Sequence, residues 1–436
     1  MAHLSSKNGM SINSKTAEVY KNKIYTFVPY NSNDTIFRSD YINKHSKKKV
    51  ENLEQHKLSN QVNPESKGEL YFLRGRTLNV TPEYNSEAEA ELGKATRFLL
   101  PDAWNELGEC QYKKGDLNGA QTCFEKALAL VKKQVYYRNM SMLMRSRTWK
   151  TQDEREKNVE KGLEYARQAL KLDMNDGHSW LVLGNAYLAS FFTIDSKLES
   201  LKNCRAAYIK AEKDPLAALL PELHFSKFHV IWYEEDYNGA LNSLRRAYEL
   251  EPTWEECRTK ADQCLAFLKK LTLMVKKKGQ LNQRRLNGLV ADISKSQLGP
   301  YEKGGTSLTG NNQPILVPLA SLEQGNNQDK VMLGKVVCTV IPESGIPFAF
   351  CLVDSAGTCV AVTVFNWASG RGVKIGDSVA VVAPVMKHHK ISGENEEVLE
   401  FVSVRVAVPL MLVVNKRPVG VDQVATSQIL SQQKPE

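Results

Sequence analysis

Residues 103–130 read AWNELGECQYKKGDLNGAQTCFEKALAL, which has the spacing of a helix-turn-helix repeat of about 34 residues. Trp104 and Gly108 fall at contact positions of the first helix, and Ala120 and Phe124 at those of the second. Small residues at such positions let two helices approach closely, while large ones fill the space between them. Because such a pair buries its open face only against another pair, the stretch predicts an array.

The same spacing recurs along the chain and predicts about five helical pairs of the tetratricopeptide type. A stack of such pairs presents an inner groove on which ligands bind. The matching residues are Leu73, Gly75 and Ala95 upstream, then Gly162, Ala166 and Ala169, then Trp180, Leu183, Gly184 and Tyr187, and finally Ala240, Leu244, Ala247 and Pro252.

The remaining chain divides by composition and periodicity. After Pro252 an amphipathic pattern predicts one long helix that caps the repeats. From about Val331 the period changes to two, and five valine-rich segments separated by turn residues predict a small closed barrel of the OB-fold type. We therefore expect a multidomain protein, an all-α tetratricopeptide solenoid followed by an all-β OB-fold barrel. The expected domains are a polar, partly disordered region 1–66, the solenoid with its capping helix 67–275, a basic segment and linker 276–328, the OB-fold 329–416 and a disordered tail 417–436.

Composition limits the class of protein. The 436 residues are 42% hydrophobic and 25% charged, as expected of a chain that mostly folds. No apolar run approaches the roughly 18 residues of a membrane span, and the amino terminus lacks the apolar segment of a signal peptide. These features predict a cytoplasmic and nuclear protein without membrane contact. Its eight cysteines have no metal-ligand spacing, so we expect reduced, buried thiols.

The sequence lacks the residue constellations of an enzyme. The glycines of SGRGVKIG, residues 369–376, lie between two predicted strands rather than before a helix, which disfavours a phosphate-binding loop. We expect no catalytic residue, no metal ligand and no cofactor.

A basic segment follows the predicted capping helix. Residues 263–291 contain no acidic side chain. A one-sign run on a structured segment favours a phosphate backbone as partner, although a plain solvated surface stays an alternative. Without interleaved aromatic residues, such a contact reads backbone shape rather than bases. The candidate residues are Lys276, Lys277, Lys278, Arg284 and Arg285.

Two further features each allow two interpretations. Arg145 and Arg147 lie among methionines in a predicted helix, and arginine suits bidentate pairing with a ligand carboxylate; taken locally, a surface arginine is the favoured interpretation. The aromatic residues of the barrel could form a platform for nucleic-acid bases, but filled barrel interior is favoured. These are Phe348, Phe350, Phe365 and Trp367.

The chain resembles the tetratricopeptide repeat protein 5 family, also called Strap, across about residues 67–416. The resemblance includes the unusual pairing of this solenoid with an OB-fold. It rests on TLNVTPEYNSEAE, AWNELGECQYKKGDLNGAQTCF, NDGHSWLVLGNAYL and ELEPTWEECR, followed by LGKVVCTVI, FAFCLVDSAG, GVKIGDSVAV and SVRVAVPLMLVVN.

The resemblance implies a non-enzymatic adaptor that reads the nascent amino-terminal Met-Arg-Glu motif of tubulin on ribosomes. Binding triggers tubulin mRNA decay through an adaptor that recruits the deadenylase complex. The family's peptide-binding residues correspond here to Arg145, Glu222 and Glu256. The family has aspartate at the second position, so the reach of Glu222 differs. The basic run is expected on ribosomal RNA.

The resemblance also implies an alternative function. The chain could act as a nuclear, stress-responsive coactivator scaffold whose repeats bind a histone acetyltransferase. In that case the OB-fold contacts chromatin or DNA. The two functions can coexist.

Overall fold

The computed structural model describes residues 64–195, 198–302, 314–343, 346–368, 370–392 and 398–425. The disorder expected for most of region 1–66 and for the end of the tail therefore lies outside the described residues. The chain forms two compact units. The first unit runs through Val230 and includes Arg246–Glu255, and the second comprises Ile231–Arg245 and Glu256–Glu436.

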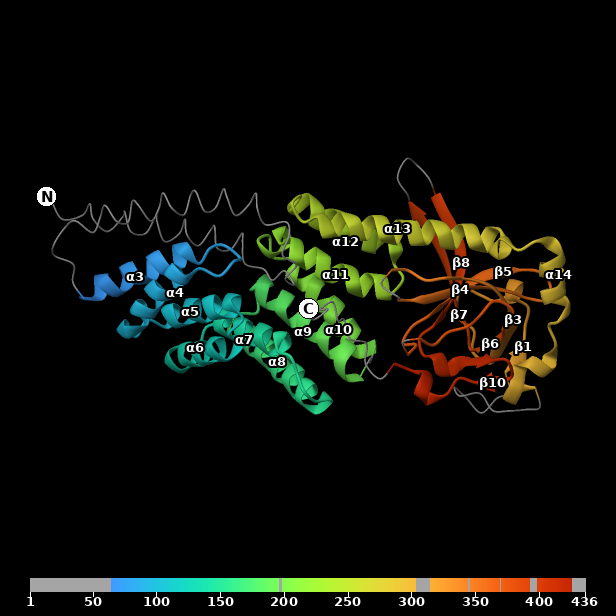
Figure 1. The fold of residues 1–436 in the computed structure, drawn as a ribbon, viewed down its shortest axis with the longest axis horizontal. Coiled ribbons are helices and arrows are strands. Elements are labelled where there is room, and N and C mark those ends of the chain that lie inside the picture. Colours follow the sequence, from blue (N-terminus) through green and yellow to red (C-terminus); the bar gives the residue numbers. More distant parts are fainter. Residues whose placement is uncertain are drawn as a thin grey trace. The chain divides into compact units, whose positions relative to one another are not determined.

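Helices account for the regular structure of the first part of the chain, in the order followed from blue to yellow in Figure 1. Ten of them, α3 to α12, alternate as first and second helices of successive pairs, and α13 follows. Their bounds are α3 Pro64–Leu78, α4 Ser86–Ala95, α5 Pro101–Lys114, α6 Leu117–Leu130, α7 Gln134–Ser146, α8 Gln152–Leu172, α9 Gly177–Ser190, α10 Leu198–Ala211, α11 Pro221–Tyr233, α12 Tyr237–Leu250 and α13 Glu255–Lys276. Across the described ranges, none of the helices is both long and apolar enough to span a bilayer.

The helical pairs pack as the repeat spacing predicts. A Cβ added at Gly108 of α5 would lie 2.5 Å from the Phe124 ring of α6, and both Ala120 and Phe124 are fully buried. The pair formed by α9 and α10 differs from the regular pattern, because a π-helical turn, Phe191–Asp195, follows α9 before α10 begins.

The described strands of the second unit form one sheet. The strand order is β10-β9-β6-β3-β4-β5-β8-β7-β2, with β1 beside β3. Since β6 and β7 are consecutive in the chain and lie at the two ends of the run β6-β3-β4-β5-β8-β7, they act as one bent strand that closes the barrel. The strands are β1 Ile315–Leu316, β2 Gly325–Asn326, β3 Lys330–Val340, β4 Phe348–Val353, β5 Cys359–Val364, β6 Ser378–Val382, β7 Val385–Ser392, β8 Val398–Val406, β9 Leu412–Val414 and β10 Arg417–Pro418.

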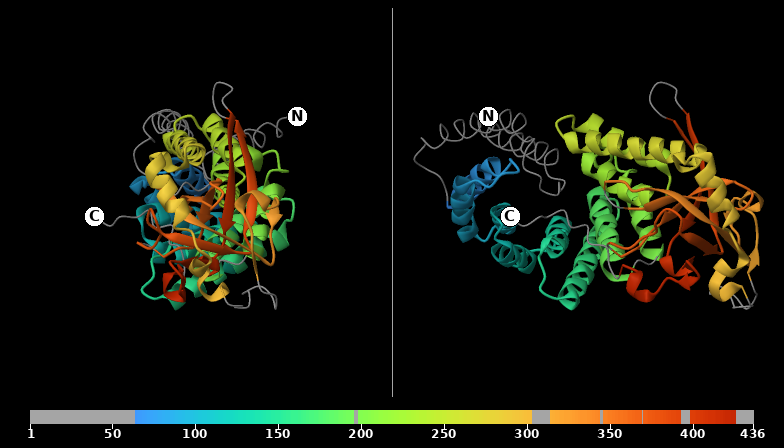
Figure 2. Two further views of the ribbon diagram at one scale, coloured as in Figure 1. Left: turned by 90° about the vertical axis from the view of Figure 1, so that its right-hand side faces the viewer. Right: turned by 45° about the vertical axis from the view of Figure 1, so that its right-hand side comes forward.

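The five predicted strand segments are confirmed as β3, β4, β5, β6 with β7, and β8. Strand β7 pairs with β8 over its whole length, whereas β5 pairs with β8 only from Ser403 onward. The β7–β8 hairpin therefore extends beyond the rest of the sheet, as Figure 2 shows.

Part of the predicted linker is structured. Helix α14, Gln283–Ala291, and the 3₁₀ segment Lys295–Tyr301 follow the basic run. Leu298 of the 3₁₀ segment is buried in a cluster with Val331 and Leu333 of β3. The beginning of the predicted linker is therefore anchored to the barrel by Leu298.

The turn between α11 and α12 packs on the outer surface of the barrel. Glu235 of this turn is buried and adopts a positive φ of 62°. Its carboxylate accepts a hydrogen bond from Thr363 of β5 (2.5 Å) and pairs with Lys387 at 3.0 Å and Arg405 at 3.3 Å. Glu235 thus joins a helical turn to strands that are more than a hundred residues away in the sequence.

Candidate peptide-binding site

Two arginines on one face of α7 differ in their partners. Arg138 forms an ion pair with Asp176 (2.7 Å), and burial lowers its pKa. Arg145 lies seven residues later, about two helical turns away on the same face. Burial lowers the pKa of Arg145 as well, yet within the described part of the chain no carboxylate lies within 4 Å of its guanidinium. Arg145 is therefore a half-buried cation that lacks a counterion among the described residues.

The second arginine of the SMLMRSR segment has a different role. Arg147 donates from Nη2 to Gln121 (2.5 Å) and Asn118 (3.1 Å), both on α6. These contacts tie the end of α7 to the preceding helix. Arg145, by contrast, has one hydrogen bond among the described residues, from Nε to the carbonyl oxygen of Ser141 in its own helix, at 3.3 Å.

Two tyrosines lie within electrostatic reach of Arg145. They are Tyr112 of α5 and the fully buried Tyr208 of α10. The Tyr112 hydroxyl shares a hydrogen bond with Ser146 (2.7 Å), and the Tyr208 hydroxyl donates to Asn185 of α9 (2.7 Å). Both hydroxyls already form hydrogen bonds and carry no charge. They therefore lie near the guanidinium but do not neutralise it. A carboxylate brought by a ligand would complete this site.

The structure links the predicted Glu222 to the same region. Ser226, one turn after Glu222 on α11, is near enough to Tyr208 to lower the pKa of its hydroxyl, although burial raises that pKa overall. Glu222 is buried in the first turn of α11, where the positive end of the helix dipole favours a carboxylate. Glu256 is half-buried in the first turn of α13, which belongs to the second unit.

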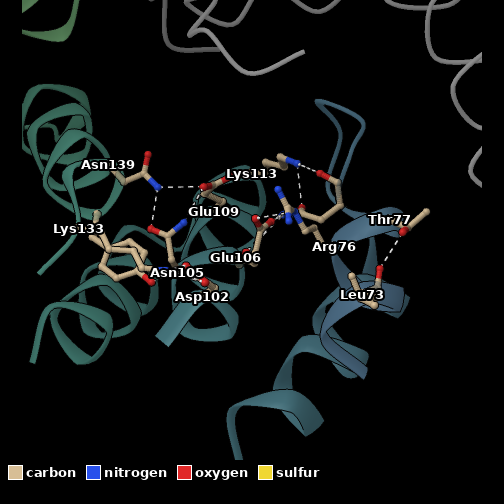
Figure 3. A network of polar contacts seen from close by, with 12 residues as sticks. Leu73, Arg76, Thr77, Asp102, Asn105, Glu106, Glu109, Lys113, Lys133 and Asn139 are labelled. Carbon is tan, nitrogen blue, oxygen red and sulfur yellow. Dashed lines mark hydrogen bonds and ion pairs between the residues drawn. The ribbon is translucent and has the colours of Figure 1, made fainter. Parts of the chain in front are cut away.

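Sequence reasoning missed the polar side chains that line the first helices of the early repeats. Asn139 donates to Asn105 and to Glu109, each at 2.9 Å, as the dashed lines of Figure 3 show. Tyr136 likewise donates to Asp102 at 2.5 Å. Asn139 with Asn105, and Tyr136 with Asp102, are pairs separated by one repeat of 34 residues. Polar residues at equal positions of successive repeats were the available signal.

The predicted basic residues are accessible. Lys276, Lys277, Arg284 and Arg285 are exposed or half-buried, and so is Lys278. In the described ranges, none of these five side chains has an acidic partner within 4 Å. The nearest acid along the chain is engaged elsewhere, because Asp292 pairs with Lys335 at 2.5 Å. The five cations therefore keep their charge available for an external anion.

The barrel's aromatic residues do not form an open platform. Phe350 and Trp367 are buried in the core cluster of the barrel, and Phe348 packs against it. Phe365 is fully buried and contacts both Tyr233 and Arg405 of the same unit. Filled interior, the favoured interpretation, is confirmed for Phe350 and Trp367. None of the buried rings is available for stacking with bases.

One group of side chains has the composition of a metal site. Asp176, His178 and Asp214 place a ligand atom each within 4.8 Å of one another. Asp176, however, already caps α9 and pairs with Arg138, and Asp214 accepts from the backbone of Gly177. Carboxylates that are engaged as helix caps and ion pairs do not fit a dedicated metal centre.

Comparison with known proteins identifies both parts of the chain. The family described as Tetratricopeptide repeat protein 5 OB fold domain matches residues 315–428, and the Tetratricopeptide repeat family matches residues 101–133. A thermophilic TPR protein in Thermus thermophilus aligns at 16% identity with 46% of this chain and 99% of its own, with a TM-score of 0.39, too low to bear on function.

Relatives that cover most of the chain extend the likeness to both units. Tetratricopeptide repeat protein 5 of Homo sapiens is 38% identical over 372 residues, which are 84% of each chain. The Mus musculus protein of the same name is 39% identical over 365 residues, 83% of each chain. With repeats and barrel both matched, the chain belongs to the tetratricopeptide repeat protein 5 family, a family of adaptor-type repeat proteins.

Proposed function

We propose that this chain is a non-enzymatic adaptor that reads the nascent Met-Arg-Glu terminus of tubulin on ribosomes and triggers decay of tubulin mRNA. The observation that carries the proposal is Arg145, a half-buried guanidinium without an acidic partner in the described part of the chain. A buried cation is costly unless a carboxylate pairs with it. The glutamate of the motif would supply that carboxylate, with the bidentate geometry that arginine favours.

The remaining contacts divide between peptide and ribosome. Glu222 and Glu256 would hold the arginine and the terminal amine of the motif, since both need acids opposite them. The basic residues Lys276–Lys278 and Arg284–Arg285 would contact ribosomal RNA through its phosphates. The peptide contact and the ribosomal RNA contact would each be weak. Because the nascent peptide is attached to the ribosome, forming one contact raises the effective concentration for the other, and the pair would select ribosomes that carry this nascent chain. A bound adaptor would then recruit the deadenylase complex in the cytoplasm.

The experiment is recovery of ribosomes that display a tubulin amino terminus or a version whose motif glutamate is moved. Wild type and Arg145→Ala proteins are compared as bait. The proposal is supported if only the wild-type protein recovers ribosomes, and only those that display the intact motif. Truncation at a charge pair of this kind costs about 2 to 5 kcal/mol, so the loss should be nearly complete. Equal recovery in all four combinations contradicts it.

The nuclear coactivator function is the second candidate. The polar side chains on the first helices of the early repeats, such as Asn105 and Asn139, would also suit a protein partner such as a histone acetyltransferase. A barrel that binds DNA by stacking is less well supported, because the candidate rings are buried. Charge reversal at Lys276–Lys278 separates the two functions: it should abolish ribosome association and leave acetyltransferase binding intact.

A further inference from the structure

Three of the eight cysteines gather on adjacent strands of the barrel. Cys338, Cys351 and Cys359 lie on β3, β4 and β5, which are neighbours in the sheet. Cys338 and Cys351 are directly opposite each other in the antiparallel register. Cys359 is opposite Val353, two residues from Cys351, and therefore on the same face of the sheet. All three are free thiols.

The three thiols follow one another in the order of their strands, with Cys351 of the middle strand between the other two. The neighbouring thiols of Cys338 and Cys359, together with burial, raise the pKa of the Cys351 thiol. Opposite residues of an antiparallel pair have Cα atoms about 4.5 to 5.5 Å apart, which is within the range that a disulfide spans. Cys338 and Cys351 therefore lie at positions that a disulfide can join, beside a register shift of β3 between Val336 and Cys338.

One end of the row is accessible and the other is not. Cys359 is half-buried and lines a cavity of about 350 Å³ together with Thr358, Met386 and Val402. At the other end, the neighbouring Cys351 and the positive charge of Lys270 lower the pKa of the Cys338 thiol. The row thus joins a thiol that a small reagent can reach to one that ionises readily.

We propose that Cys359, Cys351 and Cys338 form a thiol relay that a small hydroperoxide oxidises, and that the relay ends in a Cys338–Cys351 disulfide. First, the Cys359 thiolate attacks a peroxide oxygen, the O–O bond breaks, and hydroxide leaves and takes up a proton as water. Cys359 is then a sulfenic acid. The Cys351 thiol attacks that sulfur, an S–S bond forms and the S–O bond breaks, and the thiol proton leaves with the hydroxyl group as a second water.

In the last step the Cys338 thiolate attacks Cys351, and Cys359 leaves as a thiolate. Exchange of this kind needs three sulfurs roughly in line, and β4 places Cys351 between the other two. In total, two thiols and one hydrogen peroxide yield one disulfide and two waters. The relay does not depend on the proposed peptide-binding function, because it uses none of its residues.

The test treats the full chain with hydrogen peroxide, blocks remaining thiols with N-ethylmaleimide and maps the cysteines by peptide mass spectrometry. A Cys338–Cys351 disulfide with the other thiols alkylated is expected. Cys359→Ser should slow its formation by on the order of tenfold. Cys351→Ala should stop the reaction at a sulfenic acid on Cys359, which dimedone traps. Cys338→Ser should leave Cys351 joined to Cys359.

The buried Cys264→Ser serves as the matched control and should leave the rate unchanged. Because a variant could fail to fold, the wild-type chain is also oxidised with diamide, which must give the same disulfide. The proposal is overturned if other cysteines oxidise first, or if Cys359→Ser forms the disulfide at the wild-type rate.

Discussion

Arg145 lies within electrostatic reach of Tyr208 in the first unit. Burial raises the pKa of Tyr208 well above its usual value, and the positive charge of Arg145 opposes part of that shift. The tyrosine stays neutral, so it cannot act as the counterion. Arg145 therefore lacks a counterion among the described residues, and a carboxylate supplied by a ligand would pair with it.

The effect of this missing counterion on stability can be measured directly. Arg145→Met should raise the free energy of unfolding by about 1 kcal/mol, because an apolar side chain replaces a half-buried charge that lacks a counterion among the described residues. Arg138→Met is the matched control on the same helix face, and it should lower stability by about 3 kcal/mol since it removes the ion-pair partner of Asp176. Urea unfolding of both variants checks this. If Arg145→Met destabilises as much as Arg138→Met does, Arg145 has a structural partner.

The close packing of α9 on α10 predicts a second effect. A Cβ at Gly184 would lie 2.4 Å from the Tyr208 ring, so Gly184→Ala should cost about 1 to 3 kcal/mol and displace a residue of the Arg145 site. Gly93→Ala in α4 meets no atom of the described chain within 4 Å and should stabilise by about 0.5 to 1 kcal/mol. Thermal unfolding measures both variants. Equal changes in unfolding temperature for Gly184→Ala and Gly93→Ala would contradict the close packing at Gly184.

The second unit should lose stability in mild acid. Burial lowers the pKa of His389 to about 4, although the charge of Glu235 opposes part of this shift. Between about pH 6.5 and 4 the unfolded imidazole binds a proton that the folded one does not, so stability falls by about 3 kcal/mol over that window. His389→Phe should remove this slope. The carboxyl of Glu235 has a lowered pKa, so its contribution is lost only at still lower pH.

Hydrogen exchange of β7 and β8 in the full chain, corrected for the intrinsic effect of pH, measures this local stability. Ser403→Ala is the control, because it removes the hydrogen bond of His389 (2.7 Å) but keeps the titrating ring. Its slope with pH should match that of wild type. A His389→Phe variant with an unchanged slope would assign the acid sensitivity to other groups.

The repeats and the barrel were predictable because their patterns are local. The spacing of residues such as Gly108 and Phe124 reports which side chains meet within one helical pair. The alternation of residue types along strands β3 to β8 likewise indicates which face of the sheet is turned to the core. Contacts between distant segments leave no such pattern. Glu235, in the turn between α11 and α12, contacts Arg405 only in the folded chain, and so does Leu298 of the linker with Val331. The sequence therefore did not reveal that this turn and the linker pack on the barrel.

The candidate site was predictable only in part. Arg145 could not be distinguished from Arg147 by local sequence, and the resemblance to the family supplied the assignment. The structure separates them by their partners, since Arg147 bonds to α6 and Arg145 to its own helix. Tyr208 and Asn185 were missed as site residues because they come from helices on either side of an irregular turn.

The basic segment should act by charge. Arg284→Glu with Arg285→Glu should weaken ribosome association, with the greatest effect at low salt because phosphate contacts are salt-dependent. Lys157→Glu with Lys161→Glu makes the same change in charge at exposed positions of α8 and should have little effect. Cosedimentation with ribosomes over a salt series measures both. Equal losses for the two pairs would indicate dependence on net charge alone.

The central claim is that Arg145 pairs with the glutamate of a Met-Arg-Glu terminus. Titration calorimetry of wild type and Arg145→Met with Met-Arg-Glu and Met-Arg-Gln peptides forms a double-mutant cycle that isolates this pair. We predict a coupling energy of at least about 1.5 kcal/mol, so that wild type discriminates between the peptides and Arg145→Met does not. If replacing the glutamate costs the same affinity with both proteins, Arg145 does not bind it.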